Sequence, residues 1–236
     1  MKIQTLYASD RPIVFNKQEQ LDNNMILSEL NIISAKTGNT DLKFLIKLID
    51  QSLTLIGISD YVKNSAKRDE FMAENILWMK TNISNNGNAV VWAHNGHIAH
   101  IKSFNKLPMG YYLKEALKNK VYTLAFAFNE GMVRIKDSDP KYKGEYQQRY
   151  FASSGHKKSI EYYFKNCKPQ DFFLDFKKLN SSEYLTDFFS KNNYMRTIGS
   201  RYLGGGDASF NLAPVLNGFD GIVFFNKTSA AAGLVN

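Results

Sequence analysis

The sequence alternates between short, largely apolar runs and longer stretches whose apolar residues recur every three or four positions. Such runs occur at Ala89–Ala93, Val121–Phe128 and Phe219–Phe225, and the first is typical of a strand buried on both faces. Strands that alternate with helices usually build an α/β domain with a mostly parallel sheet flanked by helices. We therefore predict an α/β portion over residues 87–236, preceded by a helical subdomain over residues 1–86.

The first third of the chain carries helical periodicity throughout. Apolar residues at mixed three- and four-residue spacing predict helices over Gln18–Ala35 and Asp41–Ile56. A third helix is predicted over Arg68–Thr81, with Ser65 near its start as the capping residue. No strand pattern interrupts these residues, so the first third is predicted to be an appended or inserted helical subdomain.

The remaining elements follow the same two patterns. Further helices are predicted over Leu107–Lys118, Ser159–Asn166 and Ser182–Ser190, a strand over Phe172–Phe176, and a hairpin partner for the Val121–Phe128 strand over Met132–Ile135. The polar stretch Lys136–Lys158 carries spaced aromatic residues and is predicted to be either a mobile loop or a functional one that walls a site for a bulky apolar substrate. Gly204–Asp207 is predicted to be a flexible turn.

Composition excludes several classes of protein. The 236 residues are 44% hydrophobic, which suffices for a packed core. The formal net charge is +8, but the lysines are dispersed along the chain, so nucleic-acid binding is not predicted. No apolar run reaches the ~18 residues that span a bilayer, and the start has no signal-peptide pattern. The single cysteine, Cys167, is predicted to be a bystander. A cytoplasmic protein without a membrane partner is expected. The sequence does not predict its oligomeric state.

Three of the four histidines cluster directly after the first apolar run. His94, His97 and His100 follow the predicted strand Ala89–Ala93, and ligands of open α/β sheets bind beyond the carboxyl ends of strands. Histidine there can exchange a proton with a substrate near neutral pH. A metal site is the alternative, because His94 and His97 have the spacing of two ligands, although zinc usually needs three or four. We predict a metal-free site without a cofactor.

Other catalytic signatures do not occur. The sequence contains no Gly-x-Ser-x-Gly nucleophile elbow and no phosphate-binding Gly-x-x-x-x-Gly-Lys-Ser/Thr loop. The glycines at 204–206 lack the strand–turn–helix context of a dinucleotide site. These absences argue against a serine esterase of the elbow type and against a nucleotide-binding enzyme.

Two segments together resemble the erythromycin esterase family. One is Arg68-Asp69-x-x-Met72-Ala73-Glu74-Asn75 and the other is Val90-Val91-Trp92-Ala93-His94-Asn95-Gly96-His97. Softer matches follow in the same order at Met109–Leu113 and Phe219–Phe224, so the likeness covers roughly residues 65 to 227. The resemblance implies an erythromycin-esterase-like fold and an ester or macrolactone hydrolase, the activity that confers macrolide antibiotic resistance.

The resemblance also implies roles for individual residues. His94 and His97 fall on the family's active-site histidines, and Arg68, Asn75 and Asn95 are expected to bind the substrate. Arg68 and Asn75 lie seven positions apart, about two helical turns, and so share one face of a helix. A structural ion pair is the alternative role for Arg68. We expect the two imidazoles at the rim of a pocket that this helix shares.

One departure from the family limits the mechanism. Family members are longer, and their N-terminal half carries a Gly-Glu-x-x-His segment that this sequence lacks. The chain is therefore expected to be a fragment of a longer protein or a truncated relative with incomplete machinery. Water attacks the ester carbonyl in the predicted reaction, with His94 and His97 as general base or as hydrogen-bond donors to the oxyanion, the donor role being favoured. An inactive binding module and a metal-dependent hydrolase remain alternatives.

Overall fold

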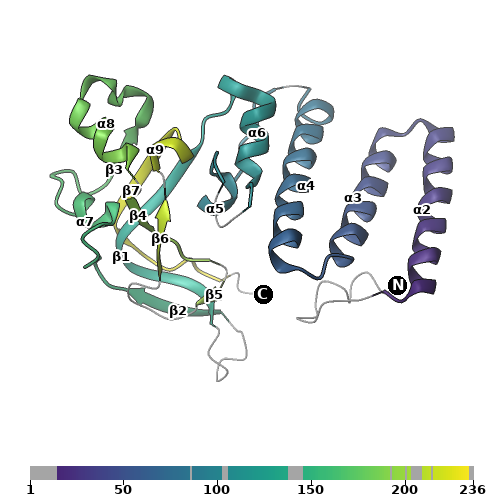
Figure 1. Ribbon diagram of the computed structural model, residues 1–236, viewed down its shortest axis with the longest axis horizontal. Coiled ribbons are helices and arrows are strands. Elements are labelled where there is room, and N and C mark those ends of the chain that lie inside the picture. Colours follow the sequence, from purple (N-terminus) through teal and green to yellow (C-terminus); the bar gives the residue numbers. More distant parts are fainter. Residues whose placement is uncertain are drawn as a thin grey trace. The chain divides into compact units, whose positions relative to one another are not determined.

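The structure is a computed structural model that describes residues 15–85, 87–102, 106–137, 146–191, 193–199, 201–202, 209–213 and 215–233. The chain divides into two compact units, Met1–Asn75 and Ile76–Asn236 (Figure 1). The predicted glycine turn at 204–206 and the middle of the predicted polar loop lie outside the described residues. No helix in the described part of the chain has the length and apolar character needed to cross a bilayer.

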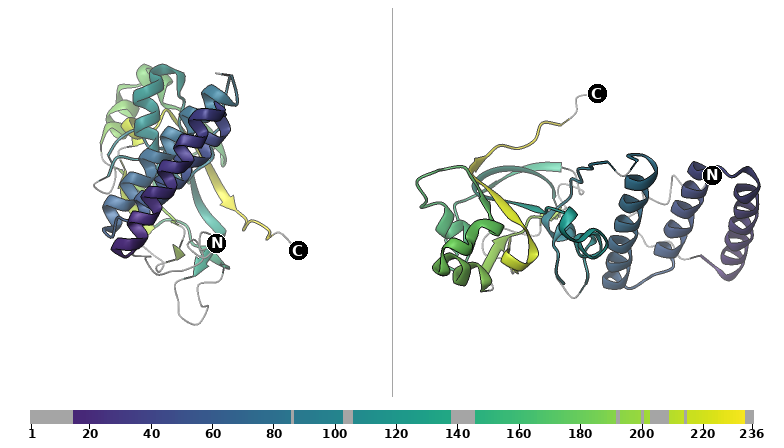
Figure 2. Two further views of the ribbon diagram at one scale, coloured as in Figure 1. Left: turned by 90° about the vertical axis from the view of Figure 1, so that its right-hand side faces the viewer. Right: turned by 90° about the horizontal axis from the view of Figure 1, so that it is seen from above.

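The first unit is helical, as the periodicity predicts. It holds α2 (Lys17–Thr37), α3 (Thr40–Ile56) and most of α4 (Tyr61–Asn82), which run side by side (Figure 2). Helix α2 begins with a capping box between Asn16 and Glu19 and ends at Gly38, whose φ of 64° is the left-handed conformation that favours glycine. Asn39 then caps α3, so two residues reverse the chain. Helix α4 starts earlier than predicted, and Ser65 lies inside it rather than at its cap.

The second unit contains a mixed set of short helices and strands. Its helical elements are α5 (Asn95–Ile98), α6 (Met109–Leu117), η1 (Lys118–Lys120), α7 (Ile160–Phe164), η3 (Phe176–Ser181), α8 (Glu183–Ser190) and α9 (Val215–Gly218). Its strands are β1 (Leu124–Asp137), β2 (Tyr146–Phe151), β3 (Phe172–Asp175), β4 (Asn193–Arg196), β5 (Arg201–Tyr202), β6 (Phe210–Ala213) and β7 (Gly221–Thr228). The α/β class is confirmed.

The main sheet is not mostly parallel, and that prediction is wrong. Its order is β2-β1-β7-β3, with β5 beside the end of β1, and β4 and β6 form a separate pair. Strand β1 pairs in parallel with β7 and β5, whereas β1–β2, β3–β7 and β4–β6 are antiparallel. Two of the four pairings in the main sheet are therefore antiparallel, and with β4–β6 three of the five pairings between described strands are. Antiparallel neighbours need no helical crossover between them, and an apolar run does not record the direction of its strand.

Strand β1 is longer than predicted because it continues through Gly131. Residues 124–131 pair with β7, and residues 131–136 pair with β2 on its other edge. Gly131 has a φ of 138°, and a Cβ there would lie 2.2 Å from the Thr228 carbonyl oxygen, so only glycine fits this change of partner. Met132–Ile135 therefore belongs to β1. The hairpin partner is β2, which occupies part of the predicted polar loop.

The apolar run Ala89–Ala93 is not a buried strand, which corrects a central prediction. It is extended but outside every sheet of the described residues, and Val90 and Trp92 are 94% and 82% exposed. A strand needs a neighbouring backbone for its hydrogen bonds. Beside this segment, the Asn95 side-chain amide binds the backbone of Phe126 in β1 instead. An apolar composition alone therefore does not create a sheet position.

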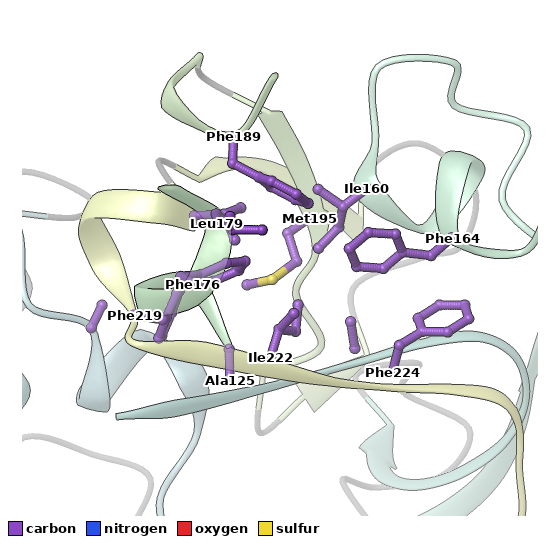
Figure 3. Close-up of a cluster of buried hydrophobic side chains, with 13 residues drawn as sticks. Ala125, Ile160, Phe164, Phe176, Leu179, Phe189, Met195, Phe219, Ile222 and Phe224 are labelled. Atoms are coloured by element: carbon purple, nitrogen blue, oxygen red, sulfur yellow. The ribbon is translucent and has the colours of Figure 1, made fainter. Parts of the chain in front are cut away.

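The core of the second unit lies on one face of the main sheet. Ala125 of β1 and Ile222 and Phe224 of β7 point towards Phe189 and Met195, which come from α8 and β4 (Figure 3). The cluster is completed by Ala99, Ala127, Ile160, Phe164, Phe176, Leu179, Val215 and Phe219. Burial of these apolar groups stabilises the unit. The helices of the second half of the chain thus fix the sheet from one side.

A charged network holds the beginnings of β1 and β7 together. The Asp220 carboxylate accepts the Thr123 backbone N–H at 2.8 Å and pairs with Lys114 Nζ at 3.1 Å. The ring of His100 binds the Thr123 hydroxyl and lies 3.6 Å from the same carboxylate. These contacts keep the pKa of Asp220 below its ordinary value although burial opposes this, because the backbone N–H, the ammonium and the imidazole favour the anion. His100 therefore serves the fold.

Candidate functional site

The histidine motif turns the chain from the exposed extended segment into the short helix α5. His94 is the N-cap of α5, and its Nδ1 accepts the Gly96 backbone N–H at 3.1 Å. The His97 backbone N–H donates to the His94 carbonyl oxygen at 2.8 Å. A Cβ at position 96 would lie 3.2 Å from His94 Nδ1, so glycine gives the ring room to cap. The motif is thus a local turn that fixes the His94 imidazole.

Asn95 fastens this turn to strand β1. Its Nδ2 donates to the Phe126 carbonyl oxygen at 2.7 Å, and its Oδ1 accepts the Phe126 backbone N–H at 3.1 Å. Phe126 pairs with β7 on one edge of β1, and the amide satisfies its backbone groups on the other edge, where the described residues provide no strand. The contacts give Asn95 a positioning role, and its predicted contact with substrate remains a prediction.

A pocket of about 460 Å³ opens beside His94 and Asn95. Its walls come from the histidine motif, from β1, from the chain just after β4 and from β7. The lining residues are Trp92, Ala93, His94, Asn95, Phe126, Ala127, Phe128, Val133, Arg134, Ile135, Arg196, Ile198, Gly199, Phe225 and Thr228. The volume is that of a small-molecule site. The motif and the pocket therefore coincide in space.

The imidazole of His94 is held in its neutral form. Burial lowers its pKa below the ordinary value of 6.5, and His97 adds to this effect, whereas a hydrogen bond to the Ile198 carbonyl opposes it. Because Nδ1 accepts the Gly96 N–H, the proton of the neutral ring resides on Nε2, from which it is donated to Ile198. The ring thus presents one N–H to a carbonyl oxygen at the pocket wall.

His97 lies three residues further on, in the last turn of α5. It is half-buried, and among the described residues it is not one of those that line the pocket. His97 is therefore close enough to His94 to lower the pKa of that ring, but the two histidines contribute differently to the site. The catalytic role of both remains a prediction.

Arg68 and Asn75 lie on α4 in the first unit, whereas the histidines belong to the second. Asn75 Nδ2 donates to Gln51 Oε1 on α3 at 2.8 Å, and Gln51 in turn donates to Glu74. Asn75 therefore takes part in a polar contact between two helices, and Arg68 is exposed. Their predicted contact with substrate beside the histidines stays a prediction.

Two carboxylates at strand positions have structural partners. Glu130 pairs with Lys227 at 3.6 Å, and Asp175 accepts the Lys177 backbone N–H at 3.0 Å. Cys167 is exposed as a free thiol. Within the part of the chain that the structure describes, no group of three or more His, Cys, Asp or Glu side chains is placed to hold a metal.

Comparison with known proteins assigns the chain to a family. The model of the erythromycin esterase family matches residues 46–228, which include the helix α4, the histidine motif and every strand of the main sheet. The chain belongs to the erythromycin esterase family. The match spans both units, so it also confirms the resemblance carried by the two sequence motifs.

Solved structures agree with this family fold. A Bacillus cereus protein superposes with a TM-score of 0.76 at 22% identity, over 91% of this chain and 54% of its own. A succinoglycan biosynthesis protein gives a TM-score of 0.72 at 20% identity, over 90% of this chain and 53% of its own. A histidine-to-asparagine mutant of the erythromycin esterase EreC, in its open conformation, gives 0.63 at 15% identity, over 94% and 56%.

This erythromycin esterase family chain therefore spans about half the length of those solved chains. No curated protein sequence matches it. At these identities the similarity to the solved structures supports the fold alone.

Sequence reasoning misses the cationic part of the pocket. Arg134, Arg196 and Ile198 line it. Arg134 lies in the segment predicted as a hairpin partner, next to the predicted loop. The strand that carries Arg196 is four residues long, too short to give a pattern of its own. The only sequence signal is the basic residue inside each short apolar stretch, a pattern that is also common on solvated strand faces.

Proposed function

We propose that the pocket beside His94 is the ester-binding site of an erythromycin-esterase-type hydrolase. The family assignment supports a hydrolase of this type. The observation that carries the site is the position of the His94 ring, which lines the pocket and is anchored through Nδ1, so that the proton of the neutral ring lies on Nε2. A substrate carbonyl placed beside this nitrogen would accept a hydrogen bond from it.

In the proposed reaction, water attacks the ester carbonyl and the tetrahedral oxyanion forms beside His94. The Nε2–H donates to this oxyanion, an interaction that strengthens as negative charge develops. Asn95 keeps the turn seated on β1, and the apolar walls restrict access of bulk water. His97 is proposed to assist through its closeness to His94, either by positioning or by taking the proton of the attacking water.

Among the described lining residues there is no carboxylate, and Nδ1 of His94 is already engaged. The described pocket lining therefore provides no carboxylate base, so that His97 is the one proposed proton acceptor, and the loss of a general base lowers a rate by about 10²–10⁴-fold. We therefore expect this chain to hydrolyse activated aryl esters, whose leaving groups need no proton, faster than the lactone of a macrolide.

The test replaces His94 with asparagine. Asparagine is a good N-cap residue, so H94N retains the acceptor for Gly96 and loses only the imidazole. Hydrolysis of 4-nitrophenyl acetate should fall by about 10²-fold or more, the effect of one oxyanion donor, with unchanged circular dichroism. His97→Asn should also lower the rate if both histidines act.

His156→Asn is the matched control, because the His156 ring packs on Tyr194 and Phe210 and does not line the pocket. Equal rates for wild type and H94N would remove the site assignment. A folded wild-type chain that hydrolysed no ester would instead favour a binding module, and activity lost on chelation would favour a metal-dependent hydrolase.

A further inference from the structure

The pocket beside His94 is cationic as well as apolar. Two arginines, Arg134 and Arg196, line it, and no aspartate or glutamate occurs among its described lining residues. A charged side chain lowers the free energy of a bound ligand of opposite charge most where water is partly excluded. The lining therefore favours a ligand that carries negative charge.

The two arginines are not equivalent. The guanidinium of Arg196 donates to the carbonyl oxygens of Asn129 at 2.8 Å and Ala152 at 2.7 Å, and it lies 5.0 Å from the Phe128 and Phe210 rings. Arg196 is only 7% exposed and interacts electrostatically with the buried Glu161, so its hydrogen bonds serve the fold and its charge is partly offset.

Arg134 is the arginine whose guanidinium reaches solvent. It is exposed on β1 and lies 5.5 Å from the Tyr146 ring. The guanidinium also packs against the backbone of Gly233, because a Cβ there would lie 2.0 Å from Arg134 Nη1. These neighbours orient the Arg134 guanidinium. Within the described residues, the structure gives no ion pair that compensates its charge. A guanidinium without an ion-pair partner can bind a carboxylate or a phosphate through two parallel hydrogen bonds.

A continuous aromatic wall faces the same space. The Trp92 and Phe126 ring centroids are 5.1 Å apart, and the Phe126 and Phe225 rings stack at 6.4 Å with an interplanar angle of 9°. Trp92 is 82% exposed and Phe225 is 38% exposed. An exposed indole at a pocket wall is unfavourable until a flat ligand covers it.

We propose that the pocket takes esters that carry both a flat apolar ring and an anionic group. The ring lies on the wall formed by Trp92, Phe126 and Phe225, the anion pairs with Arg134, and the ester carbonyl lies at His94. The inference rests on the proposed ester hydrolysis for its reaction, but ligand binding by the ring and the anion is measurable without turnover.

The binding test compares benzoate with its neutral counterpart benzamide by titration calorimetry. Benzoate should bind about tenfold more tightly, the effect of one charge-assisted hydrogen bond at a partly exposed site. Arg134→Gln should reduce this preference to less than about twofold, and rising salt should weaken benzoate alone. Arg149→Gln on the neighbouring strand β2 removes the same charge outside the lining and should leave the preference intact.

The aromatic wall is tested by Trp92→Ala. This variant should weaken benzoate and benzamide by the same factor, because ring stacking does not depend on the remote charge. Equal affinity of the wild type for the two ligands, or a preference that survives Arg134→Gln, would overturn the proposed ligand class.

Turnover separates this inference from the proposed function. With 4-carboxyphenyl acetate and phenyl acetate as substrates, the KM of the anionic ester should be about tenfold lower and kcat similar. Tight benzoate binding without hydrolysis of either ester would contradict the hydrolase and support the ligand class. Hydrolysis of both esters with equal KM would support the hydrolase and contradict the ligand class.

Discussion

At the scale of the residue, His94 combines a structural and a chemical role. Its Nδ1 caps α5, and its Nε2 proton points to a carbonyl oxygen. The cap requires an acceptor at Nδ1, so protonation of the ring would set an N–H against the Gly96 N–H. The same contact that fixes the ring therefore also favours its neutral form.

We predict that His94 titrates below 6.5, the ordinary value, because burial and then His97 lower its pKa. The hydrolysis rate should be constant above that pH and should fall as the pH decreases through the lowered pKa, since protonation breaks the cap. Nitrogen chemical shifts of ¹⁵N-labelled histidine report both the pKa and the tautomer. A His94 pKa above 6.5, or a proton on Nδ1 in the neutral ring, would contradict this assignment.

At the scale of the element, the position of the histidine motif depends on a close approach of α6 to α5. Gly110 in the first turn of α6 is buried, and a Cβ there would lie 1.9 Å from the Ile98 carbonyl oxygen. This contact is with backbone, so a side chain at position 110 can be accommodated only if the two helices separate.

Gly110→Ala is expected to destabilise the second unit by about 3 kcal/mol, at the upper end of overpacking costs. It should also lower ester hydrolysis in the fraction that remains folded, because α5 carries His94 and His97. Chemical denaturation and turnover measure the two effects. Gly155→Ala is the control, since nothing lies within 4 Å of the Cβ it would add. Equal stabilities of the two variants would show that α5 and α6 do not pack as described.

At the scale of the whole molecule, buried titratable groups give opposing contributions to stability. Burial raises the pKa of Glu161 to about 7, although the Arg196 backbone N–H and guanidinium oppose this. Because the folded-state pKa lies above that of the unfolded chain, this group stabilises the fold at low pH, and the stabilisation is lost as the pH rises through 7. The lowered pKa of His94 and of His100 has the opposite effect, and stability is lost as the pH falls below 6.5.

Glu161→Gln removes the first contribution and leaves the histidines in place. The amide oxygen can still accept the Arg196 N–H. The free energy of unfolding of the variant relative to wild type should therefore rise between pH 5 and 8, by on the order of 3 kcal/mol. Denaturant titrations across that range measure the difference. A difference that is independent of pH would show that Glu161 is ionised throughout.

Local patterns in the sequence predict many of the helices and one wall of the pocket. Periodicity locates α2, α3 and α8, and the His-Asn-Gly-His turn marks one wall of the pocket, whereas the predicted cap at Ser65 lies inside α4. The predicted strand at Ala89–Ala93 is wrong, because composition reports whether a segment is apolar but not whether a neighbouring backbone pairs with it. The predicted parallel sheet is wrong for a similar reason, since strand direction depends on connections between segments far apart in the sequence.

The amino-acid sequence by itself determined the helices of the first third, the family, and the placement of an imidazole at a turn. The helices and the turn depend on contacts between residues a few positions apart, and the family is recognised from short motifs. A linear pattern of residues records both. Only the tertiary structure decided that β1 exchanges partners at Gly131, that Asn95 binds strand backbone, and that Arg134 and Arg196 line the same pocket as His94. Those features arise from segments up to about a hundred residues apart, which are brought together by burial of apolar surface. Because the hydrophobic effect is non-directional, the linear sequence does not record which segments will meet.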